Sequence, residues 1–129
     1  MCISWTEATM KILIVDDSNA MRMIVKKTLR QAGFEGHDIT EAEDGLKALA
    51  AIQASPPDLV LSDWNMPNMT GLQLLEALRD GGIKLPFGFI TTETTPDMRA
   101  LALAAGAKFL ISKPFSPESF KEHLGALIQ

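Results

Sequence analysis

The fold is decided by the stretch ILIVDD at residues 12–17, a short apolar run that ends in two carboxylates. Two later stretches have a similar design, LVLSD at residues 59–63 and FLISKP at residues 109–114. Short, continuously apolar runs of this kind are typical of strands buried in a parallel sheet. If the three runs are neighbouring strands, three acids and one lysine meet at the same edge of that sheet.

Outward from these runs, the rest of the chain alternates β-type segments with amphipathic, helix-favouring segments. This alternation predicts an α/β fold, a parallel sheet covered by helices on both faces. The predicted strands are residues 11–15, 37–42, 59–63, 87–91 and 108–112.

Capping and terminating residues mark the helices between the strands. Ser18 is expected to cap the first helix, which has a basic outer face and ends near Gly33. Its apolar positions are Met21, Ile24, Val25, Thr28 and Leu29. The second helix is expected over residues 45–54, with Leu46, Leu49 and Ile52 pointing inward.

Similar signals place the other three helices. Thr70 is expected to cap the third helix, which Gly81 and Gly82 end. Pro96 and Pro117 are expected in the first turns of the fourth and fifth helices, where proline is tolerated.

Length and composition favour one globular domain. The 129 residues are 47% hydrophobic and 22% charged, which is ordinary for a folded domain. We expect a domain of residues 10–129 preceded by an extension of residues 1–9. The net charge of −4 argues against nucleic acid or anionic membrane as a partner. The sequence has no apolar stretch of membrane-spanning length and no signal peptide, so a cytoplasmic protein is predicted.

The acids at the strand ends predict a divalent cation site. Asp16 and Asp17 alone could be a solvated pair that favours the positive end of the following helix. Asp63, at an equivalent strand end, shifts the balance toward Mg²⁺, which prefers oxygen ligands.

A carboxylate can act as a nucleophile for phosphoryl transfer, and we assign this role to Asp63. Lys113 would then hold a phosphoryl oxygen, and Thr91 would offer a hydroxyl at the same edge. Thr92 is an alternative to Thr91. The glycines form no nucleotide-binding motif, and the histidines suggest neither a catalytic triad nor a metal site.

Taken together, the motifs resemble the receiver domain of two-component response regulators, over residues 11–129. The matching residues are ILIVDDS at 12–18, DWNMPNMTG at 63–71, Thr91, and KPF at 113–115. The motif after Asp63 is similar to that of the stand-alone, CheY-like chemotaxis type. The resemblance implies a doubly wound, flavodoxin-like (βα)5 fold with strand order 2-1-3-4-5.

The resemblance also implies roles for individual residues. Asp63 would take a phosphoryl group from the phosphohistidine of a histidine kinase. Mg²⁺ would be held by Asp16 or Asp17, by Asp63, and by the backbone carbonyl of Asn65. Asn65 and Glu93 match positions that modulate hydrolysis of the acyl phosphate. The peptide bond before Pro114 is expected to be cis.

Phosphorylation would draw Thr91 and Lys113 toward the new oxygens and bias a surface made by the fourth helix, fifth strand and fifth helix. Arg99, Leu103 and Leu110 are candidates for this partner surface, with ordinary helix surface and core as the alternative. Leu110 stands where many members of the family have an aromatic switch residue. The coupling is therefore expected to differ from theirs.

The leading functional hypothesis is a monomeric phospho-switch that binds a protein target, with the flagellar motor switch as one candidate. A phosphatase is a further expected partner, and membrane insertion is not expected. Alternatives are a phosphorelay intermediate, a phosphate sink, and a degenerate receiver that binds constitutively. The chain is expected to assist its own phosphorylation without being an enzyme for outside substrates, because it has no insertion that could form a substrate pocket.

Overall fold

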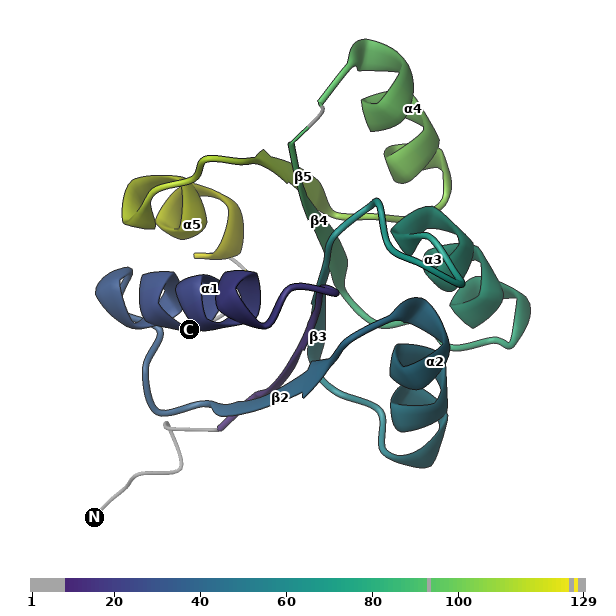
Figure 1. Ribbon diagram of the computed structural model, residues 1–129, viewed down its shortest axis with the longest axis horizontal. Helices are drawn as coiled ribbons and strands as arrows, with labels where there is room; N and C mark the ends of the chain where they lie inside the picture. The colour runs from purple at the N-terminus through teal and green to yellow at the C-terminus, as the bar shows by residue number, and fades with distance from the viewer. Residues whose placement is uncertain (1–8, 93, 126, 128–129) are drawn as a thin grey trace.

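Five parallel strands form a single sheet in the order β2-β1-β3-β4-β5 (Figure 1). The computed structural model describes residues 9–92, 94–125 and 127. The strands are β1 (Lys11–Val15), β2 (Asp38–Ala42), β3 (Leu59–Ser62), β4 (Phe87–Thr91) and β5 (Phe109–Ser112). The predicted fold class and strand order are confirmed, and every strand bound lies within one residue of its predicted place.

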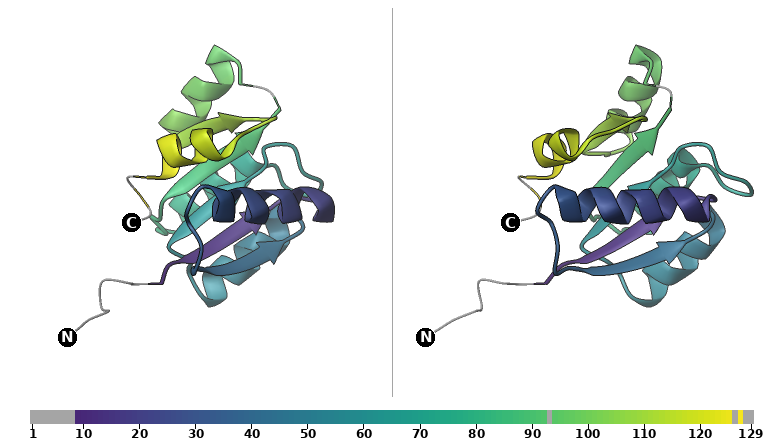
Figure 2. Two further views of the ribbon diagram at one scale, coloured as in Figure 1. Left: turned by 90° about the vertical axis from the view of Figure 1, so that its left-hand side faces the viewer. Right: turned by 60° about the vertical axis from the view of Figure 1, so that its left-hand side comes forward.

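Helices cover both faces of the sheet. The five helices are α1 (Asn19–Gln31), α2 (Gly45–Ala54), α3 (Gly71–Asp80), α4 (Pro96–Ala104) and α5 (Pro117–Leu124). Figure 1 shows α1 and α5 on one face and the other three on the opposite face. The side views in Figure 2 show α1 extending along the sheet beside β1. Within the described residues, no helix has the length and apolar character needed to cross a bilayer.

Alternating side chains of the strands divide the core into two halves. In β1, Ile12 and Ile14 pack with α1 and α5, whereas Leu13 and Val15 pack with α2 and α3. All four of these side chains are at most 2% exposed. Because β1 is buried on both faces, it reads in sequence as the continuous apolar run expected of a central parallel strand.

The predicted helix starts are confirmed. Ser18 accepts the Met21 N–H at the start of α1, and Thr70 forms a capping box with Gln73 at the start of α3. Pro96 and Pro117 lie in the first turns of α4 and α5. These signals depend on near neighbours in sequence, so they could be recognised without the fold.

Two predicted core positions are wrong. Ile24 in α1 is 48% exposed and Leu46 in α2 is 51% exposed. Each helix lies against the sheet along a narrow stripe, which Val25 and Leu29 occupy in α1 and Ala48 and Ile52 occupy in α2. Ile24 and Leu46 lie beside these stripes because a helix turns by about 100° per residue.

A glycine in β4 leaves room for an aromatic side chain of the neighbouring strand β5. Gly88 in β4 pairs with Phe109 in β5. A Cβ atom on Gly88 would lie 2.1 Å from ring atoms of Phe109, which is too close for any side chain. The Phe109 ring therefore lies over the space that a side chain at position 88 would fill, and it also packs against the His123 ring of α5.

Candidate functional site

The register of β1 and β3 brings Asp16 and Asp63 together at the carboxyl edge of the sheet. Val15 pairs with Ser62, so the residues that follow them leave the sheet side by side. The Asp63 N–H donates to the Val15 carbonyl at 2.9 Å, which continues the ladder by one residue. The two acids are thus placed by ordinary parallel pairing.

Asp16 is buried and held by several hydrogen bonds. Its backbone N–H donates to the Ala42 carbonyl at 3.1 Å, which ties it to β2. One carboxylate oxygen, Oδ1, accepts the Ser18 N–H at 2.9 Å. The other, Oδ2, lies 3.2 Å from the Lys113 ammonium. The direction of this carboxylate is therefore fixed before any cation binds.

Lys113 connects the acids after β1 and β3 to the end of β5. Its Nζ also lies 3.5 Å from Asp63 Oδ2, and its side chain is only 12% exposed. The residue follows β5, where its N–H donates to the Thr91 carbonyl at 2.8 Å. The next peptide bond, to Pro114, is cis as the resemblance implied. One ammonium is thus shared between two carboxylates in a mostly water-excluded place.

The electrostatics of Asp63 favour a bound cation. Burial raises the pKa of its carboxyl group above the ordinary value, and the nearby Asp16 charge raises it further. The Lys113 charge and the Trp64 N–H, which donates to Oδ1 at 2.7 Å, act in the opposite direction. A further positive charge at this edge would favour the ionised form of Asp63, which is the nucleophilic form.

The three acids have the geometry of a divalent cation site. One carboxylate oxygen from each of Asp16, Asp17 and Asp63 can be chosen so that all three lie within 4.8 Å of one another. Asp16 is buried, Asp63 is partly buried and Asp17 is exposed, so the site has one side open to water. Mg²⁺ prefers hard oxygen ligands and keeps several waters, so this donor set fits it.

The structure also places the other predicted site residues. Thr91 is fully buried at the end of β4, whereas its alternative Thr92 is exposed. Asn65 is exposed, two residues after Asp63. Glu93 lies outside the described residues. Short distances between side chains therefore bring together Asp16, Asp17, Asp63 and Lys113. Thr91 joins them through its backbone carbonyl, which accepts the Lys113 N–H.

The three candidates for the partner surface differ in exposure. Arg99 is exposed and Leu103 is 51% exposed, both on α4. Leu110 is only 4% exposed and packs in the core, in agreement with the alternative that the sequence left open for it. It reaches the surface only as part of the lining of a pocket of about 370 Å³, which also includes Arg99 and His123.

Comparison with known proteins explains this arrangement. Residues 12–125 match the family described as the response regulator receiver domain. The chain belongs to this family. Chemotaxis protein CheY1 of Helicobacter pylori is 43% identical to it over 122 residues, which span 92% of this chain and 97% of the relative. Chemotaxis protein CheY-3 of Vibrio cholerae is also 43% identical over 122 residues, spanning 93% of this chain and 92% of the relative.

Solved receiver structures share the fold. Chemotaxis protein CheY4 of Vibrio cholerae superposes with a TM-score of 0.82 at 38% identity, covering 94% of this chain and all of the other. The receiver domain of Francisella response regulator 1452 has a TM-score of 0.79 at 28% identity, over 92% of this chain and 96% of the other. The predicted family and architecture are confirmed.

Two contacts of Asp16 were not predicted from the sequence. Ser18 was predicted only as a helix cap, yet its N–H also holds the Asp16 carboxylate. Arg22 was assigned only to the basic face of the first helix, yet it donates to the Asp16 backbone carbonyl. A cation so near a helix N-terminus opposes the helix dipole. That mismatch is the signal by which Arg22 could have been found.

Proposed function

We propose that this protein accepts a phosphoryl group on Asp63 from the phosphohistidine of a histidine kinase, and that phosphorylation changes its binding to a protein target. The observation that carries the proposal is the Asp63 carboxylate, which lies 3.5 Å from the Lys113 ammonium and beside two further acids. This arrangement supplies a nucleophile, a cation for a phosphoryl oxygen, and ligands for a metal.

The proposed transfer is a nucleophilic displacement at phosphorus. An ionised oxygen of Asp63 attacks phosphorus, a new O–P bond forms, and the N–P bond to the donor histidine breaks. The electron pair of that bond remains on the histidine nitrogen, which takes up a proton from water. The product is an acyl phosphate on Asp63.

Asp16, Asp17, Asp63 and the Asn65 carbonyl would hold Mg²⁺. When bound, the ion offsets the negative charge that builds up around the phosphoryl group. Asp16 contributes a carboxylate that is already oriented by Ser18 and Lys113. Asp17 and Asn65 lie on the exposed side, where they can be reached by solvent and by a donor protein.

Lys113 and Thr91 would carry the signal away from Asp63. The ammonium would move from its present place between two carboxylates to a phosphoryl oxygen, and the buried Thr91 hydroxyl would turn to another. Thr91 pairs with Ser112 of β5, Lys113 follows β5, and β5 contacts α4, so their shift would bias the surface that includes Arg99 and Leu103. Asn65 and Glu93 are proposed to set the lifetime of the acyl phosphate.

We assign the target to chemotaxis, with the flagellar motor switch as the candidate, because the relatives named above are chemotaxis proteins. The cytoplasm is the proposed location, and a monomer the proposed form. The protein would assist its own phosphorylation and dephosphorylation without turning over outside substrates. A phosphorelay role would differ in one outcome, onward transfer of the phosphoryl group to a second histidine.

Intact mass spectrometry tests the phosphoryl acceptance. The protein is incubated with Mg²⁺ and acetyl phosphate, and the expected result is a gain of one phosphoryl group. Asp63→Asn should abolish the gain, and removal of Mg²⁺ by a chelator should suppress it. Asp80→Asn, which changes an exposed acid in the last turn of α3, is the matched control and should behave like the wild type.

Two outcomes would contradict the proposal. Labelling that persists in Asp63→Asn would remove the assigned role of Asp63. A wild-type protein that is not labelled by acetyl phosphate or by a histidine kinase would favour the degenerate receiver. Loss of the label to a histidine phosphotransfer protein, without any change in target binding, would instead favour the phosphorelay role.

A further inference from the structure

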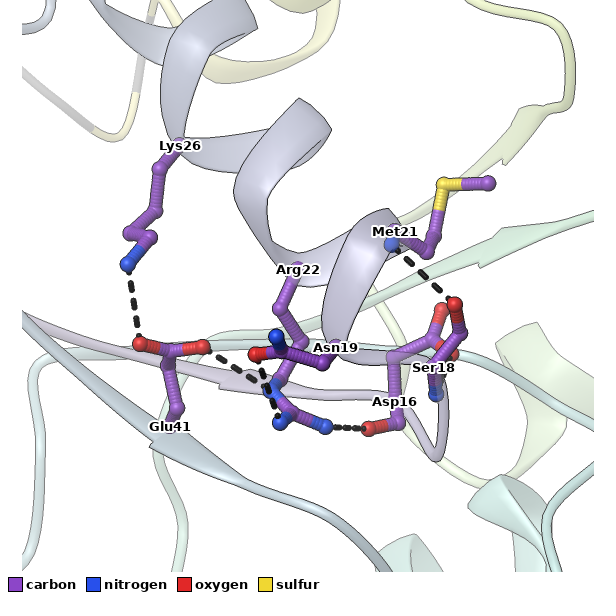
Figure 3. Close-up of polar contacts among 7 residues, drawn as sticks. All are labelled: Asp16, Ser18, Asn19, Met21, Arg22, Lys26 and Glu41. Carbon is purple, nitrogen blue, oxygen red and sulfur yellow. Dashed lines mark hydrogen bonds and ion pairs between the residues drawn. The ribbon is translucent and has the colours of Figure 1, made fainter.

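Arg22 links three parts of the molecule beside the acidic site (Figure 3). Its Nη1 donates to the backbone carbonyl of Asp16 at 2.5 Å, and its Nε donates to Glu41 Oε1 at 2.8 Å. Its Nη2 donates to Asn19 Oδ1 at 3.2 Å. The side chain is only 13% exposed although it carries a charge. The planar guanidinium is thus held by partners on β2, on α1 and in the loop between β1 and α1.

Glu41 fixes the guanidinium from the other side. It lies on β2, where it pairs with Ile14 of β1, and its second carboxylate oxygen accepts Lys26 Nζ at 2.9 Å. The hydrogen bond from Lys26 and that from Arg22 lower the pKa of the Glu41 carboxyl group against the opposing effect of burial. Glu41 is therefore an ionised anchor that is shared by two cations from α1.

The contact with Asp16 acts on a rigid unit of the backbone. The carbonyl of Asp16 and the N–H of Asp17 belong to one planar peptide group. A donor that fixes the carbonyl therefore also fixes the direction in which the chain enters Asp17. Within the described part of the chain, the Asp17 side chain has no hydrogen-bond or ion-pair partner that could orient it. The point from which its carboxylate can reach the site is therefore set by the backbone.

We propose that Arg22, anchored by Glu41, is a positioning residue of the cation site: it fixes the peptide between Asp16 and Asp17 and so directs the Asp17 carboxylate toward the carboxylates of Asp16 and Asp63. This inference rests on the proposed function, because that function requires the three acids to bind Mg²⁺. Arg22 touches neither the metal ligand atoms nor the phosphoryl group.

Charge alone would give the opposite result. A positive group near a cation site repels the cation, so removal of the Arg22 charge should strengthen Mg²⁺ binding if electrostatics dominate. Loss of positioning should weaken it. Glu41 offsets only part of the field of Arg22, because the same carboxylate also pairs with Lys26. The direction of the change therefore separates the two roles.

Isothermal titration of the unphosphorylated protein with Mg²⁺ measures this direction without requiring activity. We expect Arg22→Met and Arg22→Lys to weaken Mg²⁺ binding about tenfold, a typical loss when a residue that orients a metal ligand is removed. Lysine keeps the charge but cannot contact Asp16, Asn19 and Glu41 together. Lys26→Met is the matched control, because it removes a cation bound to the same Glu41 without touching Asp16. Its affinity should stay within about twofold of the wild type.

Glu41→Gln adds a second, milder variant. It should weaken Mg²⁺ binding about threefold in the wild-type background and have no further effect in Arg22→Met, since its contribution passes through Arg22. Thermal unfolding in the presence of a chelator accompanies each titration. If Arg22→Met lowers the melting temperature but leaves the Mg²⁺ affinity unchanged, Arg22 is merely structural and the inference is overturned.

Other results also decide the question. Tighter Mg²⁺ binding in Arg22→Met, or full wild-type affinity in Arg22→Lys, would overturn the inference in favour of a charge effect. A wild-type protein that binds no Mg²⁺ would overturn both this inference and the proposed function. A wild type that binds Mg²⁺ and accepts the phosphoryl group, with Arg22 variants of equal affinity, would overturn only this inference.

Discussion

Helices α1 and α4 both begin next to the candidate site, but they are attached to the domain in different ways. α1 follows Asp16 and Asp17 and buries Val25, Thr28 and Leu29, and two of its cations pair with Glu41. α4 follows Thr91 and buries only Ala102, with two leucines more than half exposed. No ion pair among the described residues involves α4. In Figures 1 and 2, α4 lies at the outer end of the molecule.

This difference divides the site into a fixed part and a movable part. Asp16 near α1 is held by β2, Ser18, Lys113 and Arg22, so a cation would meet a ligand that is already oriented. Helix α4 itself has few contacts to lose, so a small shift at Thr91 or Lys113 could move this helix. Regions with little buried apolar surface open most easily. We therefore expect metal binding to depend on the α1 side and the proposed response to depend on the α4 side.

The largest expected effect is on stability. Leu29→Ala in α1 should lower the free energy of unfolding by about 3 kcal/mol, because Leu29 is 1% exposed and its loss leaves a cavity. Leu101→Ala in α4 should change it by less than about 0.5 kcal/mol, because that side chain is 53% exposed. Urea unfolding measures both. Equal losses would show that α4 is as firmly attached as α1.

A smaller effect is expected at Asp63 in metal-free buffer. The pKa of this carboxyl group is raised in the folded protein, so the stability due to its protonated form is present at acidic pH and is lost as pH rises through the raised pKa. Above that pKa, the free energy of unfolding of Asp63→Asn should be about 0.5–1 kcal/mol higher than that of the wild type. This is the scale of one partly screened charge contact.

Thermal unfolding at several pH values checks this prediction. The advantage of Asp63→Asn should shrink as pH falls toward the raised pKa, and Mg²⁺ should reduce it at neutral pH by stabilising the wild type. An advantage that is independent of pH would mean that the ionised carboxylate costs nothing in the fixed part of the site.

The two helix caps are expected to differ, and the cap of α4 should have the smallest effect on global stability. Ser18→Ala should lower the free energy of unfolding by about 1 kcal/mol, because α1 unfolds together with the domain. Thr95→Ala should lower it by less than about 0.5 kcal/mol and instead speed amide exchange in residues 96–104 about fivefold, because α4 can open locally. Hydrogen exchange with mass spectrometry measures the difference. Unchanged exchange in α4 would contradict its local opening.

Much of the fold was predictable because the decisive signals are local. The apolar run ILIV before Asp16, the capping Thr70 and the first-turn prolines each depend on a few neighbouring residues. The convergence of Asp16, Asp63 and Lys113 also followed from one topological rule, that the carboxyl ends of parallel strands meet at one edge. The family motifs supplied the strand order.

The parts that were missed depend on contacts between distant residues. Arg22 meets Glu41 because β1 and β2 pair in one particular register, which places Glu41 beside Ile14. Ile24 and Leu46 have the periodicity of core residues, but the width of each helix contact decides their exposure. Leu110 matches a switch position of the family by its place in the fifth strand, and the side of β5 on which it lies places it in the core. Neither these contacts nor these exposures can be predicted from a few neighbouring residues.

The fit between Gly88 and Phe109 also restricts how this protein can be recombined. A chimaera that takes β4 from a homologue with any side chain at position 88, while keeping Phe109, would bring two groups into the same volume. Taking β5 alone from a homologue with a small residue at position 109 would leave a void beside α5. Crossover points for domain shuffling should therefore keep β4 and β5 from the same parent.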